Sequence, residues 1–131
     1  MEGARFRART RAEELVSAWL AGDYDTVSAA CTTDVLWWTP ATGETASGPD
    51  DTSAALRAVL APLRRPVAVT AVVPSDDGTR CVVEMRAATA PQDSPASFMT
   101  SVLTLRDGKI SAGRTYTDLR GTSHYPGVVA P

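Results

Sequence analysis

The stretch TDVLWWTP, residues 33–40, decides how the remaining sequence is interpreted. β-branched and aromatic residues dominate it, which is typical of a strand, and Pro40 ends the strand because proline cannot donate to the sheet. Since successive side chains alternate between two faces, Trp37 and Thr39 share one face and Trp38 takes the other. Trp37 is therefore open to two interpretations, an aromatic wall for a flat or polycyclic ligand or ordinary core packing.

Two helical patterns come before this strand. Thr10–Glu13 fits a capping box, and apolar side chains then recur at helical spacing until Gly22, a typical helix end. The basic residues 1–9 are expected to form a frayed start to this helix. Asp23 is expected to cap a second, short helix over about residues 24–32.

A loop, a third helix and four strands are expected after Pro40. The loop covers residues 41–51, and Asp51 or Thr52 is expected to cap a helix that reaches about Leu63. The strands are expected over residues 67–73, 80–89, 96–105 and 109–119. The resulting order, α-α-β-α-β-β-β-β, predicts an α+β fold.

The strand expected at residues 80–89 shows which of its faces meets the core. Its apolar face is expected to point inward and comprises Cys81, Val83, Met85 and Ala87. Glu84 and Arg86 then belong to the opposite, convex side, where they are expected to form a surface or dimer ion pair.

The composition of the 131 residues is that of an ordinary globular protein, with 44% apolar and 21% charged residues. The net charge of −2 provides no basic field for nucleic acid, and no apolar run approaches the ~20 residues of a membrane span. Cys31 and Cys81 lie far apart without metal-ligand spacing, so they are expected to be reduced and buried. These features predict a cytoplasmic protein of one domain. They predict no metal site and no binding to nucleic acid or to a membrane.

Four short motifs resemble, in their order and spacing, the NTF2-like superfamily, which includes SnoaL-like polyketide cyclases, ketosteroid isomerases and limonene-epoxide hydrolases. The motifs are Ala21-Gly22-Asp23-Tyr24-Asp25, the stretch at 33–40, Gly48-Pro49-Asp50, and Asp107-Gly108-Lys109-Ile110 with Arg114-Thr115-Tyr116-Thr117-Asp118. The resemblance spans about residues 11–119 and leaves an irregular tail at 120–131.

This resemblance implies a cone in which a curved, mixed and mainly antiparallel sheet wraps around three helices and encloses an apolar pocket. It also implies a homodimer formed through the convex face of the sheet. The residues expected around the pocket are Trp19, Trp37, Thr39, Leu56, Met85 and Phe98. Thr39 stands where ketosteroid isomerases carry their catalytic Asp, which argues against that particular activity.

Asp118 is the first candidate for chemistry. In SnoaL-like cyclases and epoxide hydrolases an Asp of this strand faces the pocket as general acid or base, and an apolar wall raises the pKa of such a carboxyl group towards neutrality. The alternative is a solvated or Arg-paired carboxylate at the strand end. Arg114 and Tyr116 share its face if the strand is regular, either as polar partners in the pocket or as a dimer contact. His124 is expected either in solvent or over the pocket mouth as an acid/base.

These expectations favour a cofactor-independent tailoring enzyme of secondary metabolism, a SnoaL-like cyclase or isomerase acting on a small apolar or polycyclic substrate. The alternative is a non-catalytic small-molecule-binding or assembly module on the same fold. Epoxide hydrolysis is a second alternative, disfavoured because it needs two acids and the sequence offers one well-matched acid.

Overall fold

The computed structural model describes residues 2–40, 42–61, 66–87 and 98–118. Helices and strands follow one another along these ranges in the order expected for an α+β protein, with one additional strand. They are α1 (Glu2–Ala21), α2 (Tyr24–Ala30), β1 (Cys31–Thr39), β2 (Glu44–Ser47), α3 (Gly48–Leu60), β3 (Val67–Pro74), β4 (Arg80–Ala87), β5 (Phe98–Arg106) and β6 (Lys109–Asp118).

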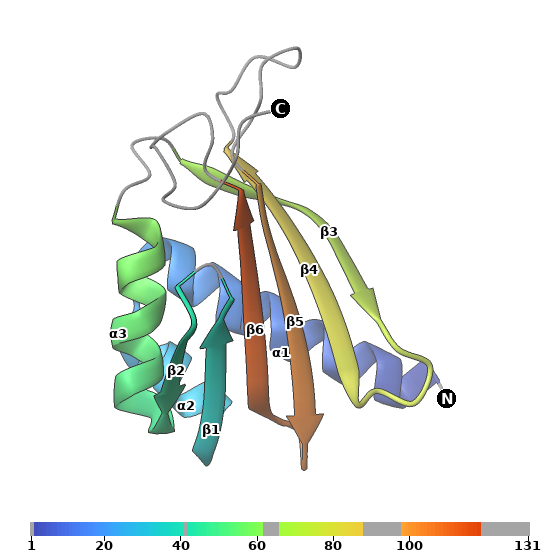
Figure 1. Ribbon diagram of the computed structural model, residues 1–131. Helices are drawn as coiled ribbons and strands as arrows, with labels where there is room; N and C mark the ends of the chain where they lie inside the picture. Colours follow the sequence, from blue (N-terminus) through green and yellow to red (C-terminus); the bar gives the residue numbers. More distant parts are fainter. Residues whose placement is uncertain (1, 41, 62–65, 88–97, 119–131) are drawn as a thin grey trace.

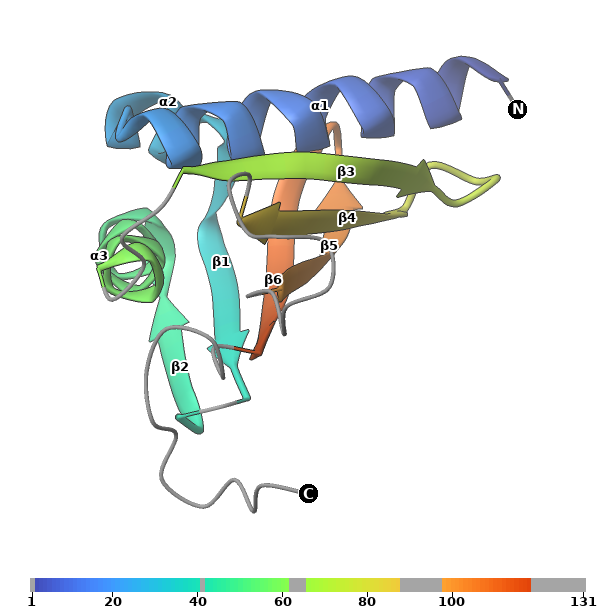
Figure 2. The ribbon, with the colours of Figure 1, turned by 90° about the horizontal axis from the view of Figure 1, so that it is seen from above.

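The strands form one curved sheet in the order β2-β1-β6-β5-β4-β3. β1 and β6 pair in parallel, and the other neighbouring strands pair antiparallel, so the sheet is mixed and mainly antiparallel, as expected. Figure 1 shows α1 crossing behind the sheet and α3 standing beside β2. In Figure 2, β3 runs alongside α1, whereas β1 and β6 run away from it, which displays the curvature of the sheet.

The first helix begins much earlier than the sequence indicates. The expectation of a frayed start at residues 1–9 and a capping box at Thr10 was wrong, because α1 is helical from Glu2 onward. Ala8 is buried, so this part of the helix packs on the protein. The carbonyl group of Ala4 lies against Gly78 in the turn between β3 and β4. Tertiary contact with that turn therefore stabilises residues that a local cap cannot explain.

The segment expected to be a loop at residues 41–51 contains both a strand and the start of a helix. β2 pairs antiparallel with β1, and Ala46 lies opposite Trp37. The expected caps at Asp51 and Thr52 were also wrong, since α3 begins at Gly48. Proline has a fixed φ that suits the first turn of a helix, and Pro49 occupies that turn. The residues Glu44, Thr45, Ala46 and Ser47 have no strand pattern of their own, and they form β2 because the neighbouring strand β1 pairs with them.

Two local predictions from the motifs are confirmed. The Asp23 side chain accepts a hydrogen bond from the Thr26 backbone N–H at 3.2 Å, which caps α2. A second hydrogen bond, from the Thr26 hydroxyl at 2.6 Å, and this backbone bond lower the pKa of the Asp23 carboxyl group. At the β5–β6 hairpin, Asp107 and Gly108 both have positive φ, of 53° and 76°, as a tight turn requires.

Side chains on the sheet alternate between an inner face, which meets the helices, and an outer face. In β4 the expected inner residues Cys81, Val83 and Met85 are buried, and Glu84 is exposed on the outer face as expected. The core between this inner face and the helices is apolar, and its largest fully buried side chains include Trp19, Trp37 and Leu15. Burial of such large side chains is the main source of stability in a chain of this size.

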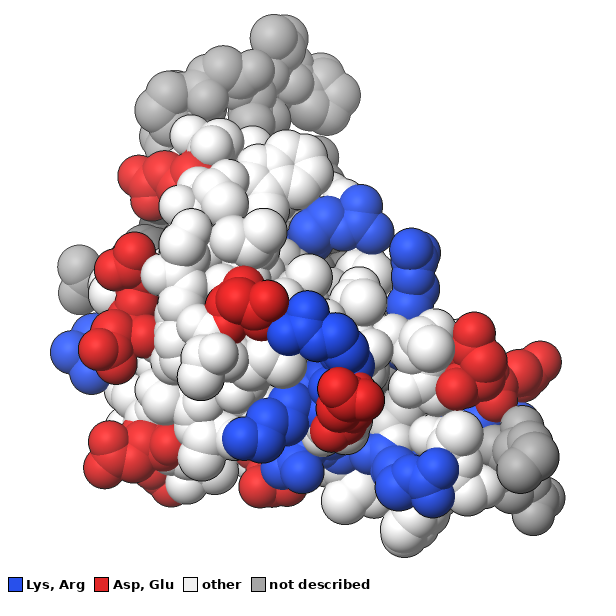
Figure 3. Space-filling model, turned by 90° about the horizontal axis from the view of Figure 1, so that it is seen from below, with Lys and Arg blue, Asp and Glu red and all other residues white. Residues whose placement is uncertain are grey.

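Charged side chains on the surface are mixed in sign. In the view of Figure 3, basic side chains form a band with acidic side chains among them. Exposed or half-buried ion pairs among the described residues join Arg5 to Asp76, Arg9 to Glu13, Arg11 to Glu14 and Arg106 to Asp34. None of the helices in the described ranges combines the length and the hydrophobicity that a membrane span requires.

We predict that Gly78→Ala destabilises the protein more than Gly108→Ala does. Both glycines lie in hairpin turns with nearly equal φ, of 72° and 76°, so each substitution costs about 1–2 kcal/mol for the left-handed backbone. A Cβ at position 78 would also lie 2.5 Å from the Ala4 carbonyl oxygen, whereas nothing lies within 4 Å at position 108. Urea unfolding measures the free energies, and equal losses would contradict the packing of α1 on this turn.

Candidate functional site

A short chain of buried hydrogen bonds crosses the inner face of the sheet. The Trp37 indole Nε1–H donates to the Thr115 hydroxyl oxygen at 2.9 Å, and the Thr115 and Ser101 hydroxyl oxygens lie 3.0 Å apart. Ser101 and Thr115 are paired residues of β5 and β6, and the side chains of all three are buried. The chain thus places neutral polar groups from three strands at one point of a mainly apolar interior.

The position of the Trp37 ring depends on the glycine at position 113, which has no side chain. Trp37 lies opposite Gly113 in the parallel pair of β1 and β6. A Cβ built at Gly113 would lie 2.5 Å from the ring atoms Cε3 and Cζ3 of Trp37, a distance that real Cβ atoms do not show. Glycine at position 113 therefore lets the indole lie flat on β6 and reach Thr115.

The second buried tryptophan connects two helices over this interior. The Trp19 Nε1–H in α1 donates to the Leu56 carbonyl oxygen in α3 at 2.8 Å, and both residues are fully buried. This bond satisfies the one polar group of the ring and fixes the two helices relative to each other.

Most predicted lining residues come together inside the cone. Those that are buried on the inner face or against it are Trp19, Trp37, Thr39, Leu56 and Met85. The sixth, Phe98, begins β5, and its side chain lies outside the described part of the structure. Met85 and Met99 are paired across β4 and β5, and both are buried. The two methionines thus add flexible thioether groups to the buried inner face.

The buried polar side chains of the described residues are all neutral. They are Thr39, Thr52, Ser53, Ser101 and Thr115. The Ser53 hydroxyl lies 3.2 Å from that of Ser28, while no partner is found for the Thr52 hydroxyl among the described residues. Such groups orient a ligand by hydrogen bonds but do not exchange a proton at neutral pH.

The two cysteines are free thiols and are buried, as expected. Burial raises the pKa of each thiol to about 11, because desolvation disfavours the thiolate. Nearby Lys109 partly opposes this effect at Cys31. At neutral pH both side chains are protonated and pack as small hydrophobic groups, so neither is an activated nucleophile.

The predicted catalytic residues of β6 are placed differently from the lining residues. Arg114 and Tyr116 are exposed on the outer face, and the Arg114 guanidinium carbon lies 5.9 Å from the centre of the Tyr116 ring. Asp118 ends the strand and pairs with Phe98, in a register without shifts from Ala112 onward. Asp118 is an even number of residues away from Arg114 and Tyr116, so by its position in the strand it belongs to the same face as these two residues.

Two of these catalytic predictions fall outside what the structure describes. The Asp118 side chain lies outside the described part, and His124 lies in residues 119–131, which are also outside it. Their roles stay predictions. The described residues contain no group of three or more His, Cys, Asp or Glu side chains arranged to hold a metal ion.

The pairing of Ser101 with Thr115 on the inner face of the sheet was not predicted from the sequence. The signal was present in β5, where Met99, Ser101, Leu103 and Leu105 alternate on one face and are buried. A hydroxyl within an apolar face requires a partner, and that partner lies on the neighbouring strand. Only the register of β5 against β6 shows that the partner is Thr115.

We predict that Thr115→Val destabilises the protein by about 1–3 kcal/mol, because the buried Trp37 N–H loses its acceptor. Thr115→Ser is the matched control, since it keeps the hydroxyl and removes only a methyl group. Urea unfolding followed by tryptophan fluorescence measures both variants. If Ser costs as much stability as Val, the hydrogen bond does not hold the ring.

Comparison with solved structures shows the fold. An LEH-like epoxide hydrolase from M. tuberculosis is 21% identical, with a TM-score of 0.66 over 90% of this chain and 87% of that one. A protein from Kribbella flavida proposed to be a ketosteroid isomerase is 17% identical, with a TM-score of 0.69 over 97% and 83%. A protein from Xanthomonas campestris pv. campestris proposed to be a polyketide cyclase is 20% identical, with a TM-score of 0.68 over 90% and 95%.

These likenesses establish the NTF2-like α+β cone, and at such low identities they show the fold alone. No curated protein sequence matches the chain. The SnoaL-like domain family matches residues 12–113, which include the second half of α1, the predicted lining residues, and Trp37 and Ser101 of the hydrogen-bond chain, while Thr115 lies two residues beyond the match. The match covers most of the sequence, and the chain belongs to the SnoaL-like domain family.

Proposed function

We propose that this protein binds a small apolar or polycyclic molecule inside the cone and converts it without a cofactor, as a SnoaL-like cyclase or isomerase of secondary metabolism acting in the cytoplasm. The observation that carries the binding part is the buried chain of Trp37, Thr115 and Ser101. A flat ligand would pack on aromatic and thioether groups while a hydroxyl of the chain oriented its polar end.

The number of hydrogen atoms that this chain of groups can donate supports a role in orienting a ligand. The indole N–H and the two hydroxyls supply three hydrogens, and two hydrogen bonds join the three groups. One hydroxyl hydrogen is thus not used within the chain. A ligand with a neutral acceptor, such as a ketone oxygen, is the partner that such a donor recognises in an apolar surrounding.

The catalytic part of the proposal assigns the proton transfer to Asp118. As a general base, its carboxylate would take a proton from a carbon beside a carbonyl group and return it at another atom. This proton balance needs no external oxidant or reductant. His124 is the predicted polar partner of Asp118, whereas Arg114 and Tyr116, which were predicted in the same role, are exposed on the outer face. Shape would contribute as well, since a cone holds a flexible substrate in one reactive conformer.

A second candidate is a non-catalytic small-molecule-binding or assembly module on the same cone. The exposed outer positions of Arg114 and Tyr116, and the neutral set of buried polar side chains among the described residues, favour it. Epoxide hydrolysis is a third candidate, because one similar structure is an epoxide hydrolase. It requires two acids and a positioned water, so it has less support from the residues.

We predict that Asp118→Asn retains ligand binding but slows proton abstraction at least about a hundredfold, the size of effect that a general base contributes. The ligand is 1-tetralone, a bicyclic ketone. Quenching of tryptophan fluorescence reports its binding, and NMR in deuterium oxide follows exchange of its α-protons. Asp25→Asn is the control, because Asp25 is an exposed carboxylate on α2.

The two assays separate the candidates. Equal exchange rates in Asp118→Asn and the unaltered protein would remove Asp118 from the mechanism. Binding without any accelerated exchange, in the unaltered protein, would support the non-catalytic module.

We also propose a homodimer formed through the outer face of the sheet. Three large apolar side chains are exposed there, Leu36 at 51%, Trp38 at 40% and Tyr116 at 41%. β1 and β6 are neighbours, so these side chains belong to one patch. A contiguous apolar patch on a sheet face is typical of a protein interface.

We predict that Trp38→Asp converts a dimer into a monomer, because a carboxylate would be desolvated against the partner copy. Val69→Asp is the matched control: Val69 is also 40% exposed but lies on the edge strand β3. Sedimentation velocity measures the mass of each variant. Dissociation by the Val69 substitution instead would assign the interface to the β3 edge.

A further inference from the structure

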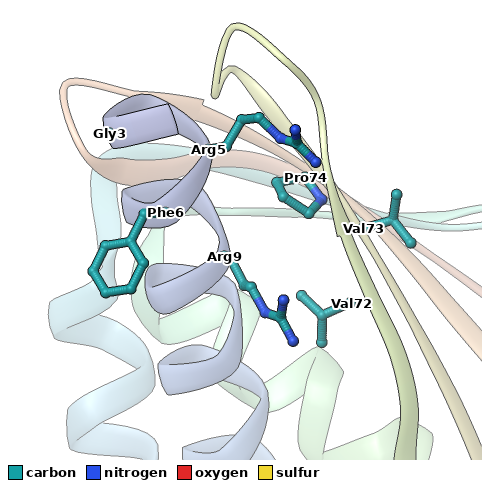
Figure 4. Close-up of a pocket in the computed structure, with 7 residues that line it drawn as sticks. All are labelled: Gly3, Arg5, Phe6, Arg9, Val72, Val73 and Pro74. Carbon is teal, nitrogen blue, oxygen red and sulfur yellow. The ribbon is translucent and has the colours of Figure 1, made fainter. Parts of the chain in front are cut away.

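The outer face of the sheet extends as far as Val73 on the edge strand β3. A groove of about 630 Å³ lies between α1 and β3, and its lining includes Val72 and Val73. In Figure 4, Val72 lies on the side of β3 that faces α1, whereas Val73 points away from the helix. The strand pairing agrees with this alternation, because Val72 lies opposite buried Val83 and Val73 lies opposite half-buried Val82. Val73 therefore belongs to the outer face.

The strand register places Val73 at one end of a row of side chains that crosses the outer face. Val73 lies opposite Val82, which lies opposite Val102 in β5. Val102 lies opposite Arg114 in β6, and Arg114 lies opposite Trp38 in β1. The two ends of the row, Val73 and Trp38, are 58% and 40% exposed. The fold thus leaves a mainly apolar band across the outer face partly uncovered.

Two opposite charges lie on either side of β5 in this region. Exposed Glu84 of β4 lies opposite Thr100, and exposed Arg114 of β6 lies opposite Val102. The two charged residues are two strands apart, a separation of about 10 Å across the strands. Neither of them takes part in the ion pairs of the described residues, whereas half-buried Arg86, beside Glu84 on the same face, already has an interaction within the chain. Glu84 and Arg114 are therefore available to a partner.

An acid and a base on opposite sides of an apolar centre make this face complementary to itself. A two-fold dimer forms every contact twice, because a residue i that meets the partner's residue j implies that j also meets i. When the two-fold axis lies in the interface midway between Glu84 and Arg114, each carboxylate faces a guanidinium group of the other copy. The two ion pairs then lie on either side of the apolar side chains at the centre.

We propose that a second copy of this chain docks on the outer face in this register, with Glu84 of each copy against Arg114 of the other. Val82 and Val102 of both copies pack between the two ion pairs. A guanidinium group holds a carboxylate in two parallel hydrogen bonds, so these pairs fix the orientation of the copies. The register rests on the homodimer proposed above and specifies contacts that the apolar patch alone leaves open.

Other kinds of partner fit this face less well. An acidic partner would place like charges against Glu84, and a basic partner would do so against Arg114. A wholly apolar partner would cover both charges without pairing them, which costs free energy because a desolvated charge has lost its water. A surface that presents a base to Glu84 and an acid to Arg114 avoids these costs, and the chain itself carries such a surface.

Reversal of single charges tests the register. Glu84→Arg and Arg114→Glu are each expected to raise the dissociation constant of the dimer at least about a hundredfold, because like charges then meet at two symmetric places. Sedimentation velocity of the full chain measures this constant, and circular dichroism checks that each variant is folded. Glu44→Arg and Arg7→Glu are the matched controls, since they make the same changes of charge at exposed residues away from the outer face and leave the dimer unchanged.

An equal mixture of the two single variants gives the sharpest test. The Glu84→Arg chain carries a base at both positions, and the Arg114→Glu chain carries an acid at both. The mixture is therefore expected to form heterodimers with a dissociation constant within about tenfold of that of the unaltered dimer. The double variant, in which the two charges are exchanged, is expected to dimerise to the same extent.

Two results would overturn this register. The first is that both single variants remain dimeric while Trp38→Asp dissociates the dimer, which would keep the homodimer in another arrangement. The second is that the mixture forms no heterodimer although each single variant is monomeric. A monomeric unaltered protein would instead overturn the homodimer itself, and the register with it.

Discussion

The contact of the Trp37 ring with Gly113 is the constraint on which the rest of the interior depends. It occurs in the pairing of β1 with β6, the parallel pair of the described sheet, which joins the first strand of the chain to the last. Any side chain at position 113 would occupy the space of the ring. Only with the indole flat on β6 does its N–H reach Thr115, and through it Ser101 on β5. Because Gly113 has no Cβ, polar groups from three strands can therefore form one chain of hydrogen bonds.

The alternation of side chains on the sheet separates three surfaces with different chemistry. The inner face carries neutral hydroxyls and aromatic and thioether groups, which suit a flat apolar ligand. The outer face carries Arg114 beside exposed aromatic rings, which suits contact with a second copy of the chain. The groove at the edge strand β3 is lined by Arg5 and Arg9 of α1 as well as by residues of β3. Because a residue of a regular strand belongs to only one face, Arg114 and Tyr116 do not also face the interior of the cone.

The sequence anticipated those parts of the fold that local rules govern. The alternation in residues 80–89 identified the buried face of β4, and Asp23 and Asp107-Gly108 marked a helix start and a hairpin. The start of α1 could not be found in the same way, because contact with the β3–β4 turn replaces a cap. β2 was missed for a similar reason, since its four residues, Glu44–Ser47, form a strand through their pairing with β1 and not through a pattern of their own.

By itself, the sequence determined the order of the helices and of every described strand except β2, the period of the apolar faces and the motifs that resemble the NTF2-like superfamily. The tertiary structure decided which side chains meet. It placed Arg114 and Tyr116 outside the cone and brought Ser101, Thr115 and Trp37 together inside it. It also laid Arg5 and Arg9 beside β3, more than sixty residues away in the chain. The physical reason is that period and propensity act over neighbouring residues, whereas strand register and helix docking are set by packing between distant segments.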